Sequence, residues 1–251
     1  METPTLVLCD GAAPASAAHE SYSPFVLKTH RALKLAGLEY ETRRGRMPAD
    51  FKEHNPIGQI PVLLEDGEAV ADSTRILARL VELAPSLLPS DPRARAEAWL
   101  WEDWADRALR GYVVAARWAD DRNWPAVRDA LFGSAPWLVR RFVAPLVRRR
   151  VAAGLRVADF TRAGMRALWD DYRRILDALE ARAPERGFWL GEAPSIADVG
   201  LFGHLHALRI DALTPWQARE LKLRPALTDW LDRVDEATRA RPSAIAIRHA
   251  A

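Results

Sequence analysis

The chain has 251 residues, 49% apolar and 28% charged, so it is long enough to bury one or two cores and too apolar for long disorder. Its formal net charge of +2 is too balanced for a dedicated nucleic-acid-binding protein. No apolar run could span a membrane and no secretory signal opens the chain, so we expect a cytoplasmic protein without a membrane span. The single cysteine, Cys9, excludes an internal disulfide and a cysteine-based zinc cluster.

The first part of the chain alternates strand and helix signals. Residues 4–10 predict a short apolar strand, which favours a buried structural role for Cys9 over a reactive thiol. A helix is then predicted from about Pro24, with Gly37 as its stop, and residues 38–42 predict a second strand. The order strand, helix, strand is that of a parallel crossover unit.

Two further apolar runs surround Asp66 and Gly67, the dipeptide of a tight hairpin turn. An amphipathic helix follows and ends at Pro85. The opening therefore predicts the order βαβ, an irregular or helical piece, then ββα. We expect this first domain to cover residues 1–84 and a proline-rich linker to cover residues 85–92.

Strand signals become scarce after the linker, and all ten tryptophans occur from Trp99 onward. Residues 93–251 are therefore predicted to form an all-helical second domain. Its helices are expected at residues 93–121, 125–151, 161–183, 195–209 and 225–239.

A proline inside the third predicted strand points to a binding site. Pro61 cannot donate a ladder hydrogen bond, so it indicates a strand edge, a bulge or a cis peptide that presents the backbone of Ile60 to an extended ligand. Asp72 and Ser73 then open the next helix, where free backbone N–H groups attract a carboxylate. A plain helix cap is the alternative role for this pair.

Three segments carry a resemblance to a known family. The stretch "NPIGQIPVLLEDG", continued by "VADSTRI", is similar to the most recognisable part of the cytosolic glutathione S-transferases. The stretch "FWLGEAPSIADVGLFGHL", with a capping box at Ser195 and Asp198, and the closing "RPALTDWLDRVDEATRARPS" resemble that family's second domain. The resemblance implies an α/β thioredoxin-like N-terminal domain followed by an all-α helical C-terminal domain.

The resemblance also implies an activity. It indicates a homodimeric detoxification enzyme that uses glutathione as co-substrate, needs no metal, and joins the sulfur to an electrophilic, mostly apolar small molecule. A glutathione-dependent isomerase or dehalogenase is an alternative. A second alternative is a non-catalytic interaction protein, because the arginine-rich stretch from residue 140 to residue 166 resembles the metaxin-like branch faintly. A solvated helix face is the simpler interpretation of those arginines.

A hydroxyl group is the expected catalytic group. The thiolate is the nucleophile, and a free thiol with a pKa of about 8.5 is mostly protonated at neutral pH. Alignment with the family's first helix puts Ser23 where serine-type members keep their catalytic hydroxyl, and Pro24 suits the first helical position. Tyr22 is the alternative donor and Ser21 the third choice. A plain N-cap is the structural role that Ser23 would otherwise have.

The remaining site residues follow from the resemblance. Ile60 would pair with glutathione through its backbone, Ser73 would hold the γ-glutamyl carboxylate, and Asp72 would face the amine. The glutathione-binding set is Gln59, Ile60, Pro61, Asp72 and Ser73, with Lys28 or His54 as a further candidate for the glycyl carboxylate. Plain surface groups are the alternative interpretation of Lys28 and His54. The second-substrate pocket is expected at Trp104, Arg107, Gly111 and Tyr112, with an aromatic core as the alternative.

Overall fold

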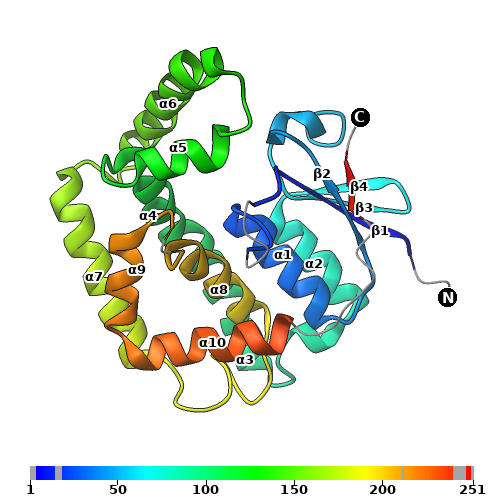
Figure 1. Ribbon diagram of the computed structural model, residues 1–251. Coiled ribbons are helices and arrows are strands. Elements are labelled where there is room, and N and C mark those ends of the chain that lie inside the picture. The colour runs from blue at the N-terminus through cyan, green and yellow to red at the C-terminus, as the bar shows by residue number, and fades with distance from the viewer. Residues whose placement is uncertain (1–3, 15–18, 211, 240–246, 250–251) are drawn as a thin grey trace. The chain divides into compact units, whose positions relative to one another are not determined.

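The computed structural model describes residues 4–14, 19–210, 212–239 and 247–249 (Figure 1). It forms two compact units, which are described separately. The first unit comprises the described residues within Met1–Asp106, Arg186–Gly203 and Leu231–Ala251. The second comprises those within Arg107–Glu185 and His204–Trp230. The first compact unit thus extends past residue 84, where the sequence analysis places the end of the first domain.

A mixed sheet forms the centre of the first unit, with the strand order β4-β3-β1-β2-β5 in the described residues. The predicted crossover is confirmed, because β1 (Leu6–Asp10) and β2 (Glu41–Arg44) are parallel. Strand β3 (Val62–Glu65) runs antiparallel to β1, and β4 (Glu68–Ala71) runs antiparallel to β3. The sequence analysis missed β5 (Ile247–His249), which pairs with β2.

The turn between β3 and β4 has the predicted geometry. Asp66 and Gly67 both have positive φ, at 50° and 91°. Two consecutive residues with positive φ are typical of the primed turns whose twist matches a two-residue hairpin. Glycine tolerates this conformation at no steric cost, so the dipeptide sets the register of the two strands.

Two helices pack beside each other in the first unit, α1 (Pro24–Leu35) and α2 (Ser73–Leu83) (Figure 1). A separate apolar cluster surrounds Phe51 of the short helix η1 (Pro48–Phe51) and includes Cys9. Cys9 is fully buried, as predicted, and burial raises the pKa of its thiol to about 11. This thiol is therefore an inert part of the core.

The long helix predicted at residues 93–121, after the linker, is confirmed in extent. It starts with α3 (Pro92–Trp104), capped by Asp91, and continues through η3 (Ala105–Leu109), α4 (Arg110–Val114) and η4 (Ala115–Ala119). The segments η3 and η4 are π-helical. A short helix, η2 (Pro85–Leu87), occupies part of the predicted linker.

The single helix predicted at residues 125–151 is wrong. The structure has α5 (Trp124–Phe132), a turn, and then a second run that contains the π-helical η5 (Val139–Val143) and α6 (Ala144–Val157). The break lies before Pro136, which has no N–H and disfavours helical geometry in the residue before it. The chain closes a turn there, since the Ala135 N–H donates to the Phe132 carbonyl at 2.9 Å.

The last helices largely match the sequence. Helices α7 (Gly164–Arg182), α8 (Ile196–Leu208) and α10 (Pro225–Arg239) lie where three of the predicted helices were placed. Helix α9 (Pro215–Lys222) was missed, since its eight residues give little periodicity. Pro215 at its first position was the available signal. No helix in the described ranges is both long and apolar enough to cross a bilayer.

Candidate functional site

Ser23 caps the N-terminus of α1. Its backbone is extended, with φ −82° and ψ 122°, and its Oγ accepts a hydrogen bond from the Val26 N–H at 3.4 Å. Pro24 occupies the first helical position, as predicted. The side chain of Ser23 is half-buried, and its hydroxyl hydrogen has no acceptor among the described residues. That hydrogen can therefore be donated to an anion at the helix N-terminus.

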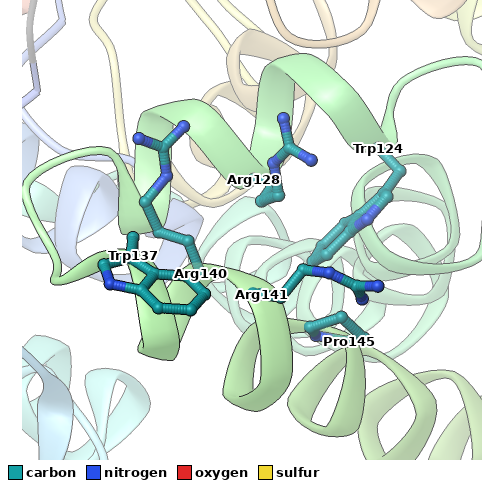
Figure 2. A pocket seen from close by; sticks show the side chains of 6 residues that line it. All are labelled: Trp124, Arg128, Trp137, Arg140, Arg141 and Pro145. Carbon is teal, nitrogen blue, oxygen red and sulfur yellow. The ribbon is translucent and has the colours of Figure 1, made fainter.

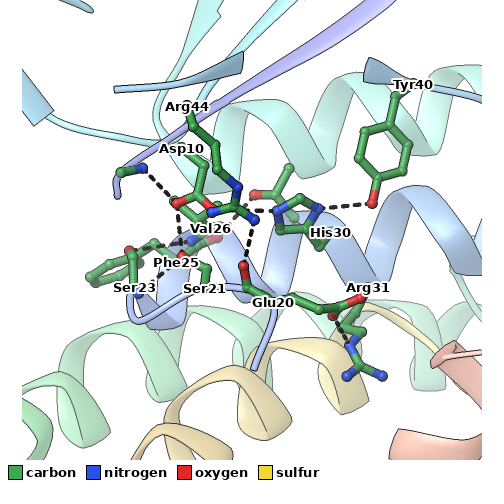
Figure 3. A network of polar contacts seen from close by, with 12 residues as sticks. Asp10, Glu20, Ser21, Ser23, Phe25, Val26, His30, Arg31, Tyr40 and Arg44 are labelled. Atoms are coloured by element: carbon green, nitrogen blue, oxygen red, sulfur yellow. Dashed lines mark hydrogen bonds and ion pairs between the residues drawn. The ribbon is translucent and has the colours of Figure 1, made fainter. Parts of the chain in front are cut away.

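Ser21 has a different role, although it lies only two residues away. Its side chain is buried, donates to Asp10 Oδ1 at 2.8 Å, and accepts the Ser23 N–H at 3.1 Å (Figure 3). The one hydroxyl hydrogen of Ser21 is thus committed to Asp10. This geometry argues against Ser21 as a donor to a bound thiol. Tyr22, between the two serines, is half-buried.

Asp10 is the centre of a buried polar network that the sequence analysis missed. It ends β1, is 1% exposed, and accepts hydrogen bonds from the Gly11 N–H at 2.7 Å and from Arg44 at 2.7 Å. Arg44 also donates to the Glu20 carbonyl at 2.8 Å (Figure 3). The loop that carries Ser23 is therefore fastened to β1 and β2. The available signal was an acidic residue directly after a buried strand.

Glu20 extends this network toward the C-terminal part of the first unit. Arg31 binds Glu20 at 2.6 Å and Asp235 at 2.8 Å, and it is 2% exposed. Burial alone would raise the pKa of the Glu20 carboxyl, but Arg31, His30 and Lys34 outweigh burial and lower it. The Glu20 carboxylate is therefore stabilised in its charged form by the fold.

The segment before β3 contains a cis peptide bond between Ile60 and Pro61. Pro61 is buried, Ile60 is half-buried against the cluster around Phe51, and the Gln59 side chain is exposed. Asn55 Nδ2 donates to the Gln59 carbonyl at 2.9 Å, so Asn55 fixes the backbone just before the cis bond. The sequence analysis did not single out Asn55, although an Asn-Pro pair is a known turn signal.

At the start of α2, Asp72 and Ser73 have separate roles. Asp72 is the N-cap, with φ 81°, and its Oδ1 accepts the N–H groups of Thr74 and Arg75 at 3.0 and 3.2 Å. Ser73 is the first helical residue, is 3% exposed, and donates to Asp106 at 3.4 Å. Asp72 therefore has the role of a helix cap, which was the alternative to ligand binding for this pair. Its predicted contact with the glutathione amine stays a prediction.

Lys28 lies in a buried charge cluster behind this helix start. Its Nζ lies 2.6 Å from Glu102 and 2.6 Å from Asp106, and both Lys28 and Glu102 have no exposed side-chain surface. Thr74 donates to Glu102 at 3.0 Å. Burial raises the pKa of Glu102 and of Asp106, although Lys28 opposes the effect. The interpretation of Lys28 as a surface group is wrong, because two carboxylates from α3 and η3 enclose it.

The four residues predicted for a second-substrate pocket are not all in one unit. Trp104 belongs to the first unit, where its ring meets Trp101 edge-on at 5.5 Å. Arg107 is exposed, whereas Gly111 and Tyr112 are buried in the second unit. Tyr112 belongs to an aromatic core, which was the alternative to a pocket: its ring packs on Phe160 and Tyr172 at centroid distances of 6.0 and 5.4 Å. The pocket itself stays a prediction.

No group of three or more possible metal ligands occurs among the His, Cys, Asp and Glu side chains of the described residues. The polar groups that the structure does assemble are hydroxyls, carboxylates and guanidinium groups at helix N-termini and strand ends. The hydroxyls and guanidinium groups among them can bind and orient an anionic ligand and stabilise a developing negative charge.

Comparison with known proteins places this arrangement in a family. Two family models match, the glutathione S-transferase N-terminal domain over residues 22–83 and the glutathione S-transferase C-terminal domain over residues 102–233. Among curated proteins, glutathione transferase GST 23 of Zea mays is 37% identical over 91 residues, 34% of this chain and 41% of that protein. Protein LigF of a Sphingobium strain is 41% identical over 73 residues, 28% of each chain. These matches span less than half of each relative's length.

Solved structures match over nearly the whole chain. The β-etherase LigF of Sphingobium has a TM-score of 0.61 and 26% identity, covering 95% of this chain and 96% of LigF. A glutathione S-transferase of Methylobacterium radiotolerans in complex with glutathione sulfonate has a TM-score of 0.58 and 25% identity, covering 98% and 96%. With both family models matched in order, the chain belongs to the glutathione S-transferase family.

Proposed function

We propose that the protein binds reduced glutathione at its first unit and uses the Ser23 hydroxyl to stabilise the thiolate for attack on an electrophilic, mostly apolar small molecule. The observation that carries the proposal is the hydroxyl hydrogen of Ser23 at the N-terminus of α1, which no described residue accepts. A donor at a helix N-terminus stabilises an anion through both its hydrogen bond and the helix dipole. Lowering the pKa of the thiol increases the fraction of nucleophile at neutral pH.

The reaction is a displacement at carbon. The thiol releases its proton to solvent, the sulfur forms a bond to the electrophilic carbon, and the leaving group departs with its bonding electron pair. The backbone of Ile60 and the backbone N–H of Ser73, the first residue of α2, would hold the tripeptide, with Gln59, Pro61 and Asp72 beside it. We further propose that the enzyme acts as a cytoplasmic homodimer in detoxification, as its family resemblance implies.

Calorimetry with reduced glutathione tests the binding step. The expected result is saturable heat at a glutathione concentration of about 1 mM or lower. A separate activity assay with an activated aryl halide tests the role of Ser23, and Ser23→Ala is expected to lose turnover. A protein that binds no glutathione, or a Ser23→Ala variant with unchanged turnover, would overturn the respective part of the proposal. Glutathione binding without turnover of any electrophile would favour the non-catalytic interaction protein.

Cleavage of an aryl ether is a second candidate reaction. It is favoured by the similarity to LigF, named a β-etherase, which covers 95% of this chain. The thiolate would attack the carbon that carries the ether oxygen, forming a thioether and releasing a phenolate. Comparing release of a fluorescent phenol from an aryl ether with displacement of an aryl halide distinguishes the two reactions, since only a protein acting as an etherase would turn over the ether.

A further inference from the structure

A long helical run at the surface of the second unit carries exposed apolar and cationic side chains together. The run comprises residues 137–157 and contains η5 and α6 (Figure 1). At a rise of about 1.5 Å per residue it is about 30 Å long. Its inner side packs on α4 and η4, with Ala144 and Leu155 buried. The opposite side of the run is exposed.

Five exposed apolar residues form a row along this outer side. They follow one another at intervals of four, four, seven and four positions, and residues at such intervals lie on one face of a helix. Three of them are 61%, 66% and 87% exposed, although residues of their types are usually buried. These three are Phe142, Leu146 and Val157, and the other two are Leu138 and Ala153. Apolar side chains gathered in this way on a surface mark an interaction site.

Arginines accompany the apolar row. The run has no acidic residue and six arginines, at positions 140, 141, 148, 149, 150 and 156. Arg140 and Arg148 have carboxylate partners, at 3.1 Å in Asp129 and at 2.6 Å in Asp121. The other four are exposed and make no ion pair with any described residue. The outer side of the run is therefore strongly positive and complements a negative surface.

The helical register places these arginines on both flanks of the apolar row. Successive residues of an α-helix are about 100° apart, so Arg149 and Arg150 fall on either side of a line from Leu146 to Ala153. Trp137 opens the run and is 70% exposed, and it lies close to Arg141 of the next turn (Figure 2). An apolar stripe with arginines beside it and a tryptophan at its end is typical of a helix that lies on a membrane surface.

The combination of groups indicates which partner this face fits. A second copy related by a two-fold axis would bring the same arginines toward one another, and like charges repel. An anionic bilayer offers both complements at once, because lipid phosphates bind guanidinium groups and the acyl boundary takes up apolar side chains. Six arginines within residues 137–157 are incompatible with a membrane span, so the run would lie in the plane of the interface.

We propose that the outer face of residues 137–157 binds the surface of an anionic lipid bilayer. Phe142 and Leu146 enter the boundary between headgroups and acyl chains, and Arg149 and Arg150 bind lipid phosphates. The face is built within the second unit and involves no glutathione. The proposal therefore goes beyond the transferase activity and stands without it.

Co-sedimentation of the full chain with vesicles tests the proposal. Vesicles of phosphatidylcholine with about one-third phosphatidylglycerol should bind the protein at least about tenfold more tightly than pure phosphatidylcholine. Arg149→Gln combined with Arg150→Gln should weaken this binding at least about tenfold, because each arginine near an anionic surface contributes roughly a factor of five. Phe142→Ser combined with Leu146→Ser should weaken it by at least about as much. All four side chains are exposed, so the variants should fold.

Two control variants carry matched changes outside the run. Arg166→Gln combined with Arg174→Gln removes the same charge from exposed positions of α7. Leu223→Ser replaces a leucine that is 67% exposed after α9. Both controls should bind the anionic vesicles within about twofold of the wild type.

Three results would overturn the proposal. The first is a wild-type protein that does not sediment with anionic vesicles, or that binds both kinds of vesicle equally. The second is an equal loss in the α7 control, since the effect would then be general charge attraction. The third is a fall in molar mass by light scattering in Phe142→Ser combined with Leu146→Ser, from a dimer to a monomer, because the face would then bind a second copy.

Discussion

The Ser21 hydroxyl donates a hydrogen bond of 2.8 Å to Asp10, and the same oxygen accepts the N–H of Ser23. Two serines in one short segment thus differ in role. Ser21 is buried and holds the segment to β1, whereas Ser23 is half-buried and retains a hydroxyl hydrogen that no described residue accepts. Ser21 therefore helps to build the site, whereas Ser23 can act on a ligand.

Replacing each serine by alanine should therefore give opposite results. Ser21→Ala is expected to lower the free energy of unfolding by about 1–3 kcal/mol, because the Ser23 N–H and Asp10 each lose a partner. Ser23→Ala should cost only about 0.5 kcal/mol, since its capping bond is long, yet raise the pKa of the bound thiol. Urea denaturation and an ultraviolet pH titration of the bound thiolate measure the two effects. The assignment fails if Ser21→Ala raises the thiol pKa as much as Ser23→Ala does.

The second prediction concerns the buried ammonium of Lys28. Lys28→Met removes the cation between Glu102 and Asp106 and leaves two buried carboxylates facing each other. Removal of one partner from a buried ion pair costs about 3–5 kcal/mol, so we expect a loss of that size in urea denaturation at neutral pH. The loss should shrink in acid, where the carboxyls of the variant take up protons.

Lys52→Met is the control for this change, because Lys52 is exposed and caps the C-terminus of η1. The same substitution there should alter the free energy of unfolding by less than about 0.5 kcal/mol. Similar losses in both variants would mean that the charge cluster contributes nothing specific to the fold.

The third prediction follows from the lowered pKa of Glu20. A carboxyl whose pKa is lower in the folded than in the unfolded state contributes stability above its unfolded pKa. That contribution is lost as the pH falls through the folded pKa. The ordinary pKa of a glutamate carboxyl is about 4.5, so we expect the loss of stability at pH values below about 4.5.

Glu20→Gln should therefore be less stable than the wild type by about 2 kcal/mol at neutral pH, because Arg31 and Lys34 lose a charged partner. The difference should narrow as the pH falls below about 4.5. Thermal unfolding of both proteins between about pH 7 and pH 3 measures it. A constant difference over this range would show that the Glu20 charge is not linked to folding.

Local signals in the sequence predicted local structure well. The hairpin at Asp66 and Gly67 depends only on the conformations that these residues tolerate. One half of the capping box is also present, since the Asp198 side chain accepts the Ser195 N–H at 2.9 Å, and it accepts the Trp189 N–H at 2.7 Å as well. Short-range geometry of this kind is encoded within a few residues, so one sequence is enough to identify it.

Long-range pairing could not be predicted in the same way. Lys28 and Glu102 are 74 residues apart, and Arg31 reaches a residue 204 positions further along the chain. Charged residues are usually exposed, so sequence alone favoured a surface position for Lys28. The break in the helix at residues 125–151 was missed for a different reason, because the apolar periodicity continues on both sides of Pro136 while the backbone turns.

The fourth prediction concerns Gly111, which lies against the ring of Phe160. A Cβ added at Gly111 would lie 1.9 Å from Phe160 Cε1, far inside contact distance. Gly111→Ala must therefore displace the ring, and overpacking of this kind typically costs about 1–3 kcal/mol. Differential scanning calorimetry should show a corresponding fall in Tm.

A smaller side chain at residue 160 should restore the loss. Phe160→Leu alone is expected to destabilise the protein, but in that background Gly111→Ala should cost less than about 0.5 kcal/mol, since the colliding ring edge is gone. Gly154→Ala in α6 is the matched control. A Cβ there meets nothing within 4 Å, so alanine should be neutral or stabilise the helix by up to about 1 kcal/mol. If Gly111→Ala is tolerated as well as Gly154→Ala, the Phe160 ring does not lie against Gly111. The packing of Tyr112 on the same ring would then be in question too.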